Sequence, residues 1–515
     1  MALEWEPPGD GLWFLTREHF PAPVSRLFAT LFPPTTRGWF TSAQAYGIPS
    51  GVARWGTSNS WLYFAPGSGA DPSTYDALEA AAVETLASAR WRDDVARWHD
   101  VDRPRIVAAN LALQHENLAT LDDLALAEHV RRAVAHFLAV GIVHFELHTA
   151  FNVAGGLLFE ACTEWGLTPP QLAPLFAGSS PASAAARVHI DRIAAAMPAP
   201  PATIDDVRAG APIELDAYLE EYGWRCLDQH EMRGATLGER PDIIVASVRA
   251  RMAGIGTTDA TRSTPAMAPD AVPEAERDRF DALLADARAT YMLNDDNVGI
   301  TWGWPLGLVR RAALDAGRRL VAGGRLHHVD HVFHADLEEL VALLAGSGPS
   351  ADALATRAVA LDDAAAADPP GSLGTPGPAS PTDVALPPTV RRLEKIRSAL
   401  WSWQPPTTDT LLTGLGIGDG VYRGRACVID GDGLLDIEPG DVIIATVTHA
   451  GHNTIFPIAG AVATAEGGLL SHPAVLAREL GLPAVVGVRG LLDHVKTGDL
   501  VEIDAAAGVI RVADR

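Results

Sequence analysis

The sequence has little cysteine, and none of it is spaced for metal or redox chemistry. Its 515 residues include 3 cysteines, and no two of them form a CxxC pair. Cysteines that are few, odd in number and far apart argue against a disulfide framework and against a zinc site. We therefore expect no bound metal and reduced, buried thiols in a cytoplasmic protein. The cysteines are Cys162, Cys226 and Cys427.

Long uncharged apolar runs are also missing. Apolar residues make up 48% of the chain, but we find no run of about 18 or more without charges, so we expect no membrane-spanning helix. The first residues, MALEWEPPGDGLW, have no basic region followed by an apolar stretch, and we expect no secretion signal. The formal charge of −24 disfavours partners with negative charge, which are nucleic acids and anionic membranes.

The length suggests two to four domains. Residues 346–388 are rich in Ala, Gly, Ser and Pro and have few large apolar side chains. Such a segment buries too little surface to offset its ordering entropy, so we predict an extended linker. The alternative is a surface excursion within one domain. Residues 389–410 follow as a connecting helix that Pro405 and Pro406 would stop.

The two sides of this segment differ in pattern. Residues 1–345 have apolar residues at three- and four-residue spacing, which indicates a mainly α-helical domain. Residues 411–515 have short β-rich runs with Gly-rich turns and one helix, PAVLAREL, which predicts a compact α/β domain. The fold class that we expect is a multidomain protein with a helical substrate domain and a C-terminal α/β domain.

The segment from Glu466 to Val488 carries the strongest chemical signal. It reads as a strand, a Gly-Gly turn, a Ser-His pair, a helix and a second strand. Gly467 and Gly468 let a ligand approach the backbone closely, and the N–H groups at the start of a helix suit an anion such as a phosphoryl group. Ser471 adds a hydroxyl, and the neutral imidazole of His472 is a nucleophile at pH 7.

This segment resembles the mobile-domain signature of the phosphoenolpyruvate-utilising enzymes, which include phosphoenolpyruvate synthase and rifampicin phosphotransferase. The resemblance implies a swivelling domain in which His472 is phosphorylated, with Ser471 and Arg478 supporting it. The chain departs from the family pattern at Pro473 and in THAGHNTIF, Thr448 to Phe456. The residues that match are Gly467, Gly468, Ser471, His472, Ala474, Ala477, Arg478, Glu479, Gly481, Pro483 and Gly487.

The helical region resembles the substrate-binding part of rifampicin phosphotransferase-like proteins more weakly, in HFPAPVSRLF, YLEEYGWR and GRLHHVDHVFHADLEEL. We find no ATP-grasp pattern and no pattern of a metal-binding barrel. The resemblance therefore implies a phosphotransferase subunit without a permanent cofactor. ATP and Mg²⁺ would act through a separate ATP-grasp subunit, and the acceptor would be the hydroxyl of a small aromatic, for example phenolic, compound. The alternatives are a non-catalytic binding or regulatory protein, and a phosphotransferase that uses a preformed donor such as phosphoenolpyruvate.

Several other residues are candidates for a substrate pocket. His144 and His148 lie one turn apart and are a metal pair, a substrate base or a core pair. Trp302 and Trp304 either line an aromatic pocket or pack in a core. Arg225, with Glu220 and Glu221, lies in the pocket or forms surface pairs. The histidines of GRLHHVDHVFH are metal ligands, acid–base groups or a solvated helix entry; they are His327, His328, His331 and His334.

Overall fold

The computed structural model divides the chain into two compact units. Unit 1 comprises Met1–Thr149, Asp228–Ala235 and Ile300–Glu394, and unit 2 comprises Ala150–Leu227, Thr236–Gly299 and Lys395–Arg515. The predicted helical region, residues 1–345, contributes to both. The residues that the structure describes are 3–17, 19–67, 71–176, 178–227, 231–255, 271–376, 385–402, 412–429, 437–448, 452–453, 455–468 and 471–513.

Unit 1 combines helices with a small antiparallel sheet of order β2-β3-β1-β4. The strands are β1 (Leu12–Leu15), β2 (Arg54–Ser58), β3 (Trp61–Ala65) and β4 (Ser372–Gly374). The α-helices that lie in this unit, or begin in it, are α1 (Arg26–Thr35), α2 (Arg37–Ala45), α3 (Tyr75–Ser88), α4 (Trp91–Arg97), α5 (Arg103–His115), α6 (Asp123–Glu164), α13 (Trp304–Ala322), α14 (Leu337–Leu344), α15 (Ala351–Ala365) and α16 (Pro388–Ser402).

Two turns of π-helix interrupt the helices of unit 1 and the junction that follows α12. They span Trp98–Asp102 and Val298–Gly303. Single π-helical turns inside helices are uncommon and often occur at functional sites. The second one carries Thr301 and Trp302.

The extended linker that we expected over residues 346–388 is wrong for the part between Ala351 and Gly374. Helix α15 begins at the cap Ser350, whose hydroxyl accepts a hydrogen bond from the Ala353 N–H at 3.2 Å, and β4 pairs with β1. The few apolar residues suffice because Leu354, Leu361 and Ala364 are all buried. Residues 377–384 lie outside the described part of the chain.

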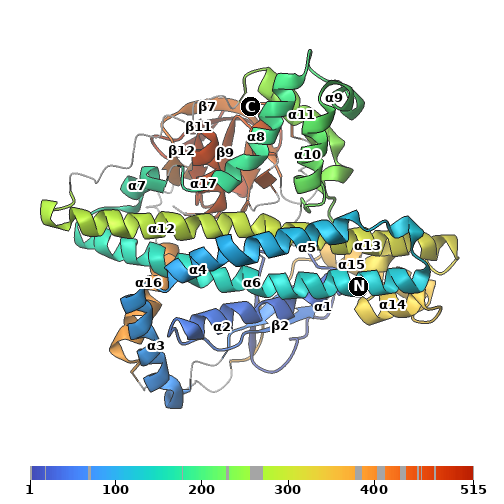
Figure 1. Cartoon of the computed structure of the whole chain (residues 1–515), viewed down its shortest axis with the longest axis horizontal. Coiled ribbons are helices and arrows are strands. Elements are labelled where there is room, and N and C mark those ends of the chain that lie inside the picture. The colour runs from blue at the N-terminus through green and yellow to red at the C-terminus, as the bar shows by residue number, and fades with distance from the viewer. Residues whose placement is uncertain are drawn as a thin grey trace. The chain divides into compact units, whose positions relative to one another are not determined.

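Unit 2 joins a helical layer to an eight-stranded sheet (Figure 1). The α-helices that lie wholly in it are α7 (Pro169–Leu172), α8 (Pro181–Ala196), α9 (Ile204–Gly210), α10 (Pro212–Tyr222), α11 (Pro241–Met252), α12 (Arg277–Asn297), α17 (His472–Leu480) and α18 (Leu491–His494). The strands are β5 (Leu412–Thr413), β6 (Leu415–Ile417), β7 (Val421–Val428), β8 (Val442–Ala445), β9 (Ala461–Thr464), β10 (Ala484–Val486), β11 (Leu500–Asp504) and β12 (Val509–Val512).

The sheet has the order β5-β12-β11-β7-β8-β9-β10-β6, in which β7, β8, β9 and β10 are parallel neighbours. The six β-rich runs predicted from the sequence form β7 to β12, and PAVLAREL lies in α17, so the mixed α/β character of this region is confirmed. Helix α17 follows β9 and precedes β10, which is the crossover that a parallel pair requires. Residues 403–411 lie outside the described part of the chain.

One core is shared by the helices and one face of this sheet. It includes Ile190 of α8 and Val248 of α11 together with Phe456, Val475 of α17 and Val462 of β9, all buried. The α/β domain therefore packs against the helical layer of unit 2 through apolar side chains, and Figure 1 shows α8 and α17 side by side. A second core covers the other face, with Val485, Leu491 and Val501.

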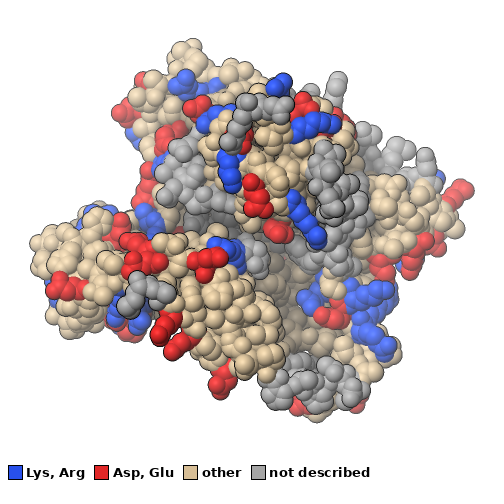
Figure 2. All heavy atoms as spheres, turned by 180° about the vertical axis from the view of Figure 1, so that it is seen from behind, with Lys and Arg blue, Asp and Glu red and all other residues tan. Residues whose placement is uncertain are grey.

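Helix α6 is long and apolar enough to span a membrane by length and composition alone, with a mean hydropathy of 1.4 in its most apolar window. Within that window 56% of the residues are buried inside the structure. Burial of this kind is typical of a core helix. On the face drawn in Figure 2, acidic and basic side chains are interspersed rather than separated by sign.

Candidate functional site

His472 is the first residue of α17, as the sequence predicts. Ser471 is the N-cap in an extended conformation, with φ −69° and ψ 154°, but its side chain does not cap the helix. Instead, the Ser471 hydroxyl donates to the carbonyl of Gly468 at 2.8 Å, and its N–H donates to the same oxygen at 3.1 Å. The serine thus closes the turn before the helix, and its side chain leaves the first backbone N–H groups of α17 to other acceptors.

The two glycines of the turn have different roles. Gly467 has φ +130°, where a Cβ would also lie 2.9 Å from the Ser471 hydroxyl. Glycine is therefore required at this position. A Cβ on Gly468 would meet nothing within 4 Å among the residues that the structure describes. Packing of those residues therefore does not require glycine there.

Both nitrogens of the His472 ring have hydrogen-bond partners. Nδ1 lies 2.8 Å from the Thr448 hydroxyl, and Nε2 lies 2.5 Å from Oδ1 of Asn453. The ring of Phe456 stands edge-on to the imidazole at 5.8 Å between centroids. These three residues come from the segment that departs from the family pattern, and they fix the ring in one orientation.

The surroundings of His472 keep its ring neutral. The pKa of His472 is lowered to about 3, mainly by burial and in smaller part by the neighbouring His452. His452 is itself 7% exposed, and burial lowers its pKa to about 3. A neutral imidazole keeps a lone pair on one nitrogen, which is what a nucleophile needs.

Arg478 lies six residues further along α17 than His472, about one and two-thirds turns away, and the groups that influence its charge include Tyr291 of α12 and Glu479. Burial is the main influence on its guanidinium and lowers the pKa of Arg478. Support of the phosphoryl group by Arg478 therefore stays a prediction.

Sequence reasoning missed one residue that links α17 to the helical layer. The buried carboxylate of Glu479 accepts a hydrogen bond from the backbone N–H of Ser180 at 3.1 Å. Ser180 is the N-cap of α8 and forms no cap with its own side chain, and Glu479 accepts from the N-cap N–H as the N3 acid of a capping box does. Glu479 matched the family pattern, but nothing in the sequence named its partner.

In unit 1 the structure brings together three of the residues predicted for a substrate pocket. The rings of His144 and His148 are 4.7 Å apart, and the ring of Trp302 is 5.4 Å from that of His144. Thr301 lies 3.4 Å from Nδ1 of His144, and Nδ1 of His148 donates to the carbonyl of His144 at 2.9 Å. Burial lowers the pKa of His148 to about 4, so this imidazole is also neutral.

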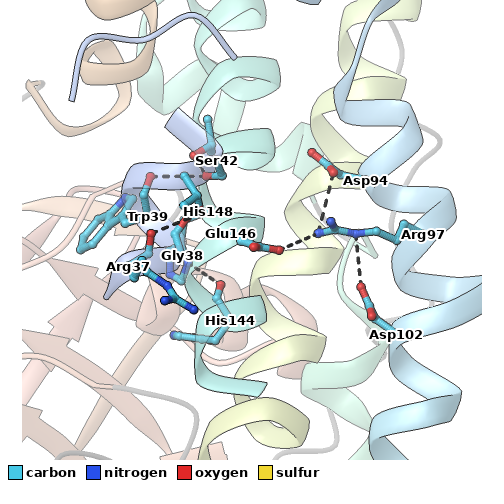
Figure 3. A network of polar contacts seen from close by, with 12 residues as sticks. Arg37, Gly38, Trp39, Ser42, Asp94, Arg97, Asp102, His144, Glu146 and His148 are labelled. Carbon is cyan, nitrogen blue, oxygen red and sulfur yellow. Dashed lines mark hydrogen bonds and ion pairs between the residues drawn. The ribbon is translucent and has the colours of Figure 1, made fainter. Parts of the chain in front are cut away.

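Figure 3 shows His144 and His148 on the side of α6 that faces α2. The ring centroids of Trp39 in α2 and His148 are 5.8 Å apart. Glu146 points the other way, to Arg97 at 3.3 Å. Glu146 therefore cannot complete a metal site with the two histidines, and the described residues contain no group of three or more potential metal ligands.

Trp304 and Arg225 each form contacts within their own unit. Trp304 is buried, and its indole N–H donates to Gln114 at 2.8 Å. Arg225 belongs to unit 2, where it stacks over the Tyr222 ring at 4.1 Å and pairs with Glu221 at 3.4 Å. The pocket of five residues stays a prediction.

The histidine-rich segment forms local polar pairs. His327 pairs with Asp352 at 2.7 Å, and the His328 ring accepts from the Asp330 N–H at 3.4 Å as a helix cap. His334 is buried, and burial lowers its pKa to about 4. His328 thus caps the short 3-10 helix Val329–His334, and His327 binds the first turn of α15.

Comparison with known proteins identifies the α/β domain. Residues 437–508 match the family model "PEP-utilising enzyme, mobile domain". A probable phosphoenolpyruvate synthase of Pyrococcus abyssi is 39% identical over 103 residues, which cover 20% of this chain and 13% of that protein. The rifampicin phosphotransferase of Streptomyces sviceus is 36% identical over 104 residues, 20% of this chain and 12% of that protein.

A longer match covers the helical regions as well. An uncharacterized protein of Mycobacterium tuberculosis is 29% identical over 452 residues, which cover 83% of this chain and 46% of that protein. The chain thus spans about half the length of the relatives that it matches over most of its own length. Residues 437–508 are therefore similar to the mobile domain of the PEP-utilising enzymes, and the relatives that match over this domain include one named as a phosphotransferase.

Proposed function

We propose that the chain is a phosphotransferase subunit in which His472 carries a phosphoryl group from an ATP-grasp partner to the hydroxyl of a small aromatic compound. The observation that carries the proposal is the neutral imidazole of His472 at the start of α17, between Thr448 and Asn453, within a PEP-utilising mobile domain.

The reaction would run in two displacements. In the first, a lone pair of His472 attacks the phosphorus, an N–P bond forms and the P–O bond to the nucleotide breaks. In the second, the acceptor oxygen attacks the same phosphorus, the N–P bond breaks and the acceptor loses its proton. Phosphoryl transfer depends mainly on positioning and on stabilising charge, which fits a ring held by hydrogen bonds and an uncapped helix start.

Unit 1 offers a candidate site for the acceptor. The side chains of Trp39, Trp302 and His148 form an aromatic cluster, with Trp39 37% exposed. Aromatic rings favour contact with another ring, and the neutral His148 could take up the proton of a phenolic hydroxyl. These features support an aromatic acceptor as the substrate class.

The test is intact-mass and acid-labile phosphate analysis of the full chain with ATP and Mg²⁺, with and without a candidate ATP-grasp partner. We expect one acid-labile phosphoryl group that requires the partner and is absent from His472→Ala. Labelling without the partner would contradict the separate donor subunit. Labelling by phosphoenolpyruvate alone would favour the preformed donor, and no labelling by either donor would favour a binding protein.

A further inference from the structure

The two hydrogen bonds of His472 determine where its ring proton lies. A neutral imidazole has one N–H donor and one acceptor nitrogen. Oδ1 of Asn453 accepts only, so Nε2 carries the proton when that oxygen faces it at 2.5 Å. Nδ1 then holds the lone pair and accepts from the Thr448 hydroxyl at 2.8 Å.

The two hydrogen-bond partners of His472 differ in how they can change between donor and acceptor. The Thr448 hydroxyl can donate to Nδ1 or accept from it by rotating a hydrogen alone. Asn453 can change from acceptor to donor only by turning its amide through about 180°, which brings Nδ2 to the ring. The amide orientation and the tautomer of His472 are therefore coupled.

The two partners also differ in exposure. Thr448 is 2% exposed, whereas Asn453 is only half-buried. A phosphoryl donor therefore reaches the ring more easily from the Asn453 side, at Nε2. In the resting arrangement this nitrogen carries the proton and has no lone pair for attack.

We propose that Asn453 is a positioning residue that sets the tautomer of His472 and thereby controls when Nε2 can attack phosphorus. Only this second role, the gate, rests on the proposed function. In the resting state the Asn453 oxygen holds the proton on Nε2. Before transfer the amide turns, Nε2 releases its proton to water, Nδ1 takes up a proton from water, and the new Nδ1–H group donates a hydrogen bond to the Thr448 oxygen. The lone pair of Nε2 then attacks phosphorus, and the P–O bond to the leaving group breaks.

Two substitutions of nearly equal size separate this role from a structural one. Asn453→Asp leaves only acceptor oxygens and should hold the proton on Nε2 permanently. Asn453→Leu has the same shape but no polar atom, so the ring should populate both tautomers. We would label histidine with ¹⁵N in the full chain, assign His472 by its absence in His472→Gln, and read the tautomer from its two ring ¹⁵N shifts.

We expect the Nε2–H tautomer in the wild type and in Asn453→Asp, and a mixture in Asn453→Leu. Loading of His472 should be about ten- to a hundredfold slower in Asn453→Asp, because a hydrogen bond to a charged group must break first, and clearly less slowed in Asn453→Leu. Equal slowing in both variants would contradict the gate and indicate a structural role.

The NMR arm needs no phosphoryl donor. A wild-type ring with its proton on Nδ1, or ring shifts unchanged by Asn453→Leu, would overturn the proposal even if loading occurs. Conversely, wild-type protein that shows the expected tautomers but is loaded by no donor would contradict the proposed function and leave the role of Asn453 in setting the tautomer established.

Discussion

At the scale of single residues, the site depends on what surrounds one imidazole. The motif identified His472 from the sequence because the glycines, the serine and the helix pattern are local in the chain. Thr448 and Asn453 could not be identified in this way, since they lie 24 and 19 residues away in the sequence and contact the ring only in the folded chain. Their only signal was that the segment departs from the family pattern.

Thr448 gives the first prediction at this scale. Thr448→Val keeps the shape of the side chain but removes the hydroxyl from Nδ1, so a buried ring nitrogen loses its partner. We expect loading of His472 to slow by about tenfold or more, measured as the rate of acid-labile phosphate formation. Thr448→Ser, which keeps the hydroxyl, should load at nearly the wild-type rate, and equal rates in the two variants would contradict the role.

At the scale of elements, hydrophobic pattern predicted β7 to β12 and α17 well, because each is short and strongly patterned. Composition failed for α15, where Leu354 and Leu361 lie seven residues apart and so on one helix face. A low count of large apolar residues conceals such a helix when the two leucines among them are both buried. Capping by Ser350 was the local sign that could have identified it.

The bond from Glu479 to α8 gives the second prediction. Glu479→Ala leaves the buried N–H at the start of α8 without its acceptor, and the free energy of unfolding should fall by about 1–3 kcal/mol. Glu479→Gln keeps an acceptor oxygen and loses only the charge at the helix start, which should cost about 0.3–1 kcal/mol. Urea unfolding measures both, and faster amide exchange at the start of α8 in the alanine variant is the local check.

If both variants unfold like the wild type and exchange at α8 is unchanged, the carboxylate does not cap that helix in solution. Glu466 of the same domain provides a matched control: it lies before the Gly-Gly turn and is exposed. Glu466→Ala should therefore leave exchange at α8 as it is.

At the scale of the whole molecule, the sequence indicated a helical part and an α/β part, but not how they divide. The predicted division at residue 346 followed composition, whereas the two compact units change inside α6, between Thr149 and Ala150. No composition signal marks that point, because α6 is one unbroken helix of 42 residues. Division into units depends on which distant segments pack together, and periodicity does not report this.

Acid should destabilise the molecule as a whole. Among the described residues, five histidines have folded-state pKa values well below the ordinary 6.5 because burial disfavours the charged form, so the unfolded chain binds more protons below pH 6.5. Their stabilising contribution is complete above pH 6.5 and is lost as the pH falls towards 4. They are His136, His148 and His334 with pKa values of about 4, and His452 and His472 with values of about 3.

The measurement is the free energy of unfolding in urea between pH 7.5 and 5, above the range in which most carboxylates titrate. Each buried histidine should contribute a slope of about 1.4 kcal/mol per pH unit below 6.5. His334→Gln should reduce the slope by about that amount. A pH-independent free energy over this range would mean that these rings are accessible to protons in the folded protein.

The shared core of unit 2 limits how the α/β domain can move relative to the helices that it packs against. Phe456 and Val475 are buried in the same core as Ile190 and Val248. If the α/β domain dissociated from the helices, this apolar surface would be exposed to water. Each square ångström of apolar surface uncovered costs about 25 cal/mol. A freely diffusing, undocked state of the domain is therefore costly, and the domain should pass directly from one complementary apolar surface to another.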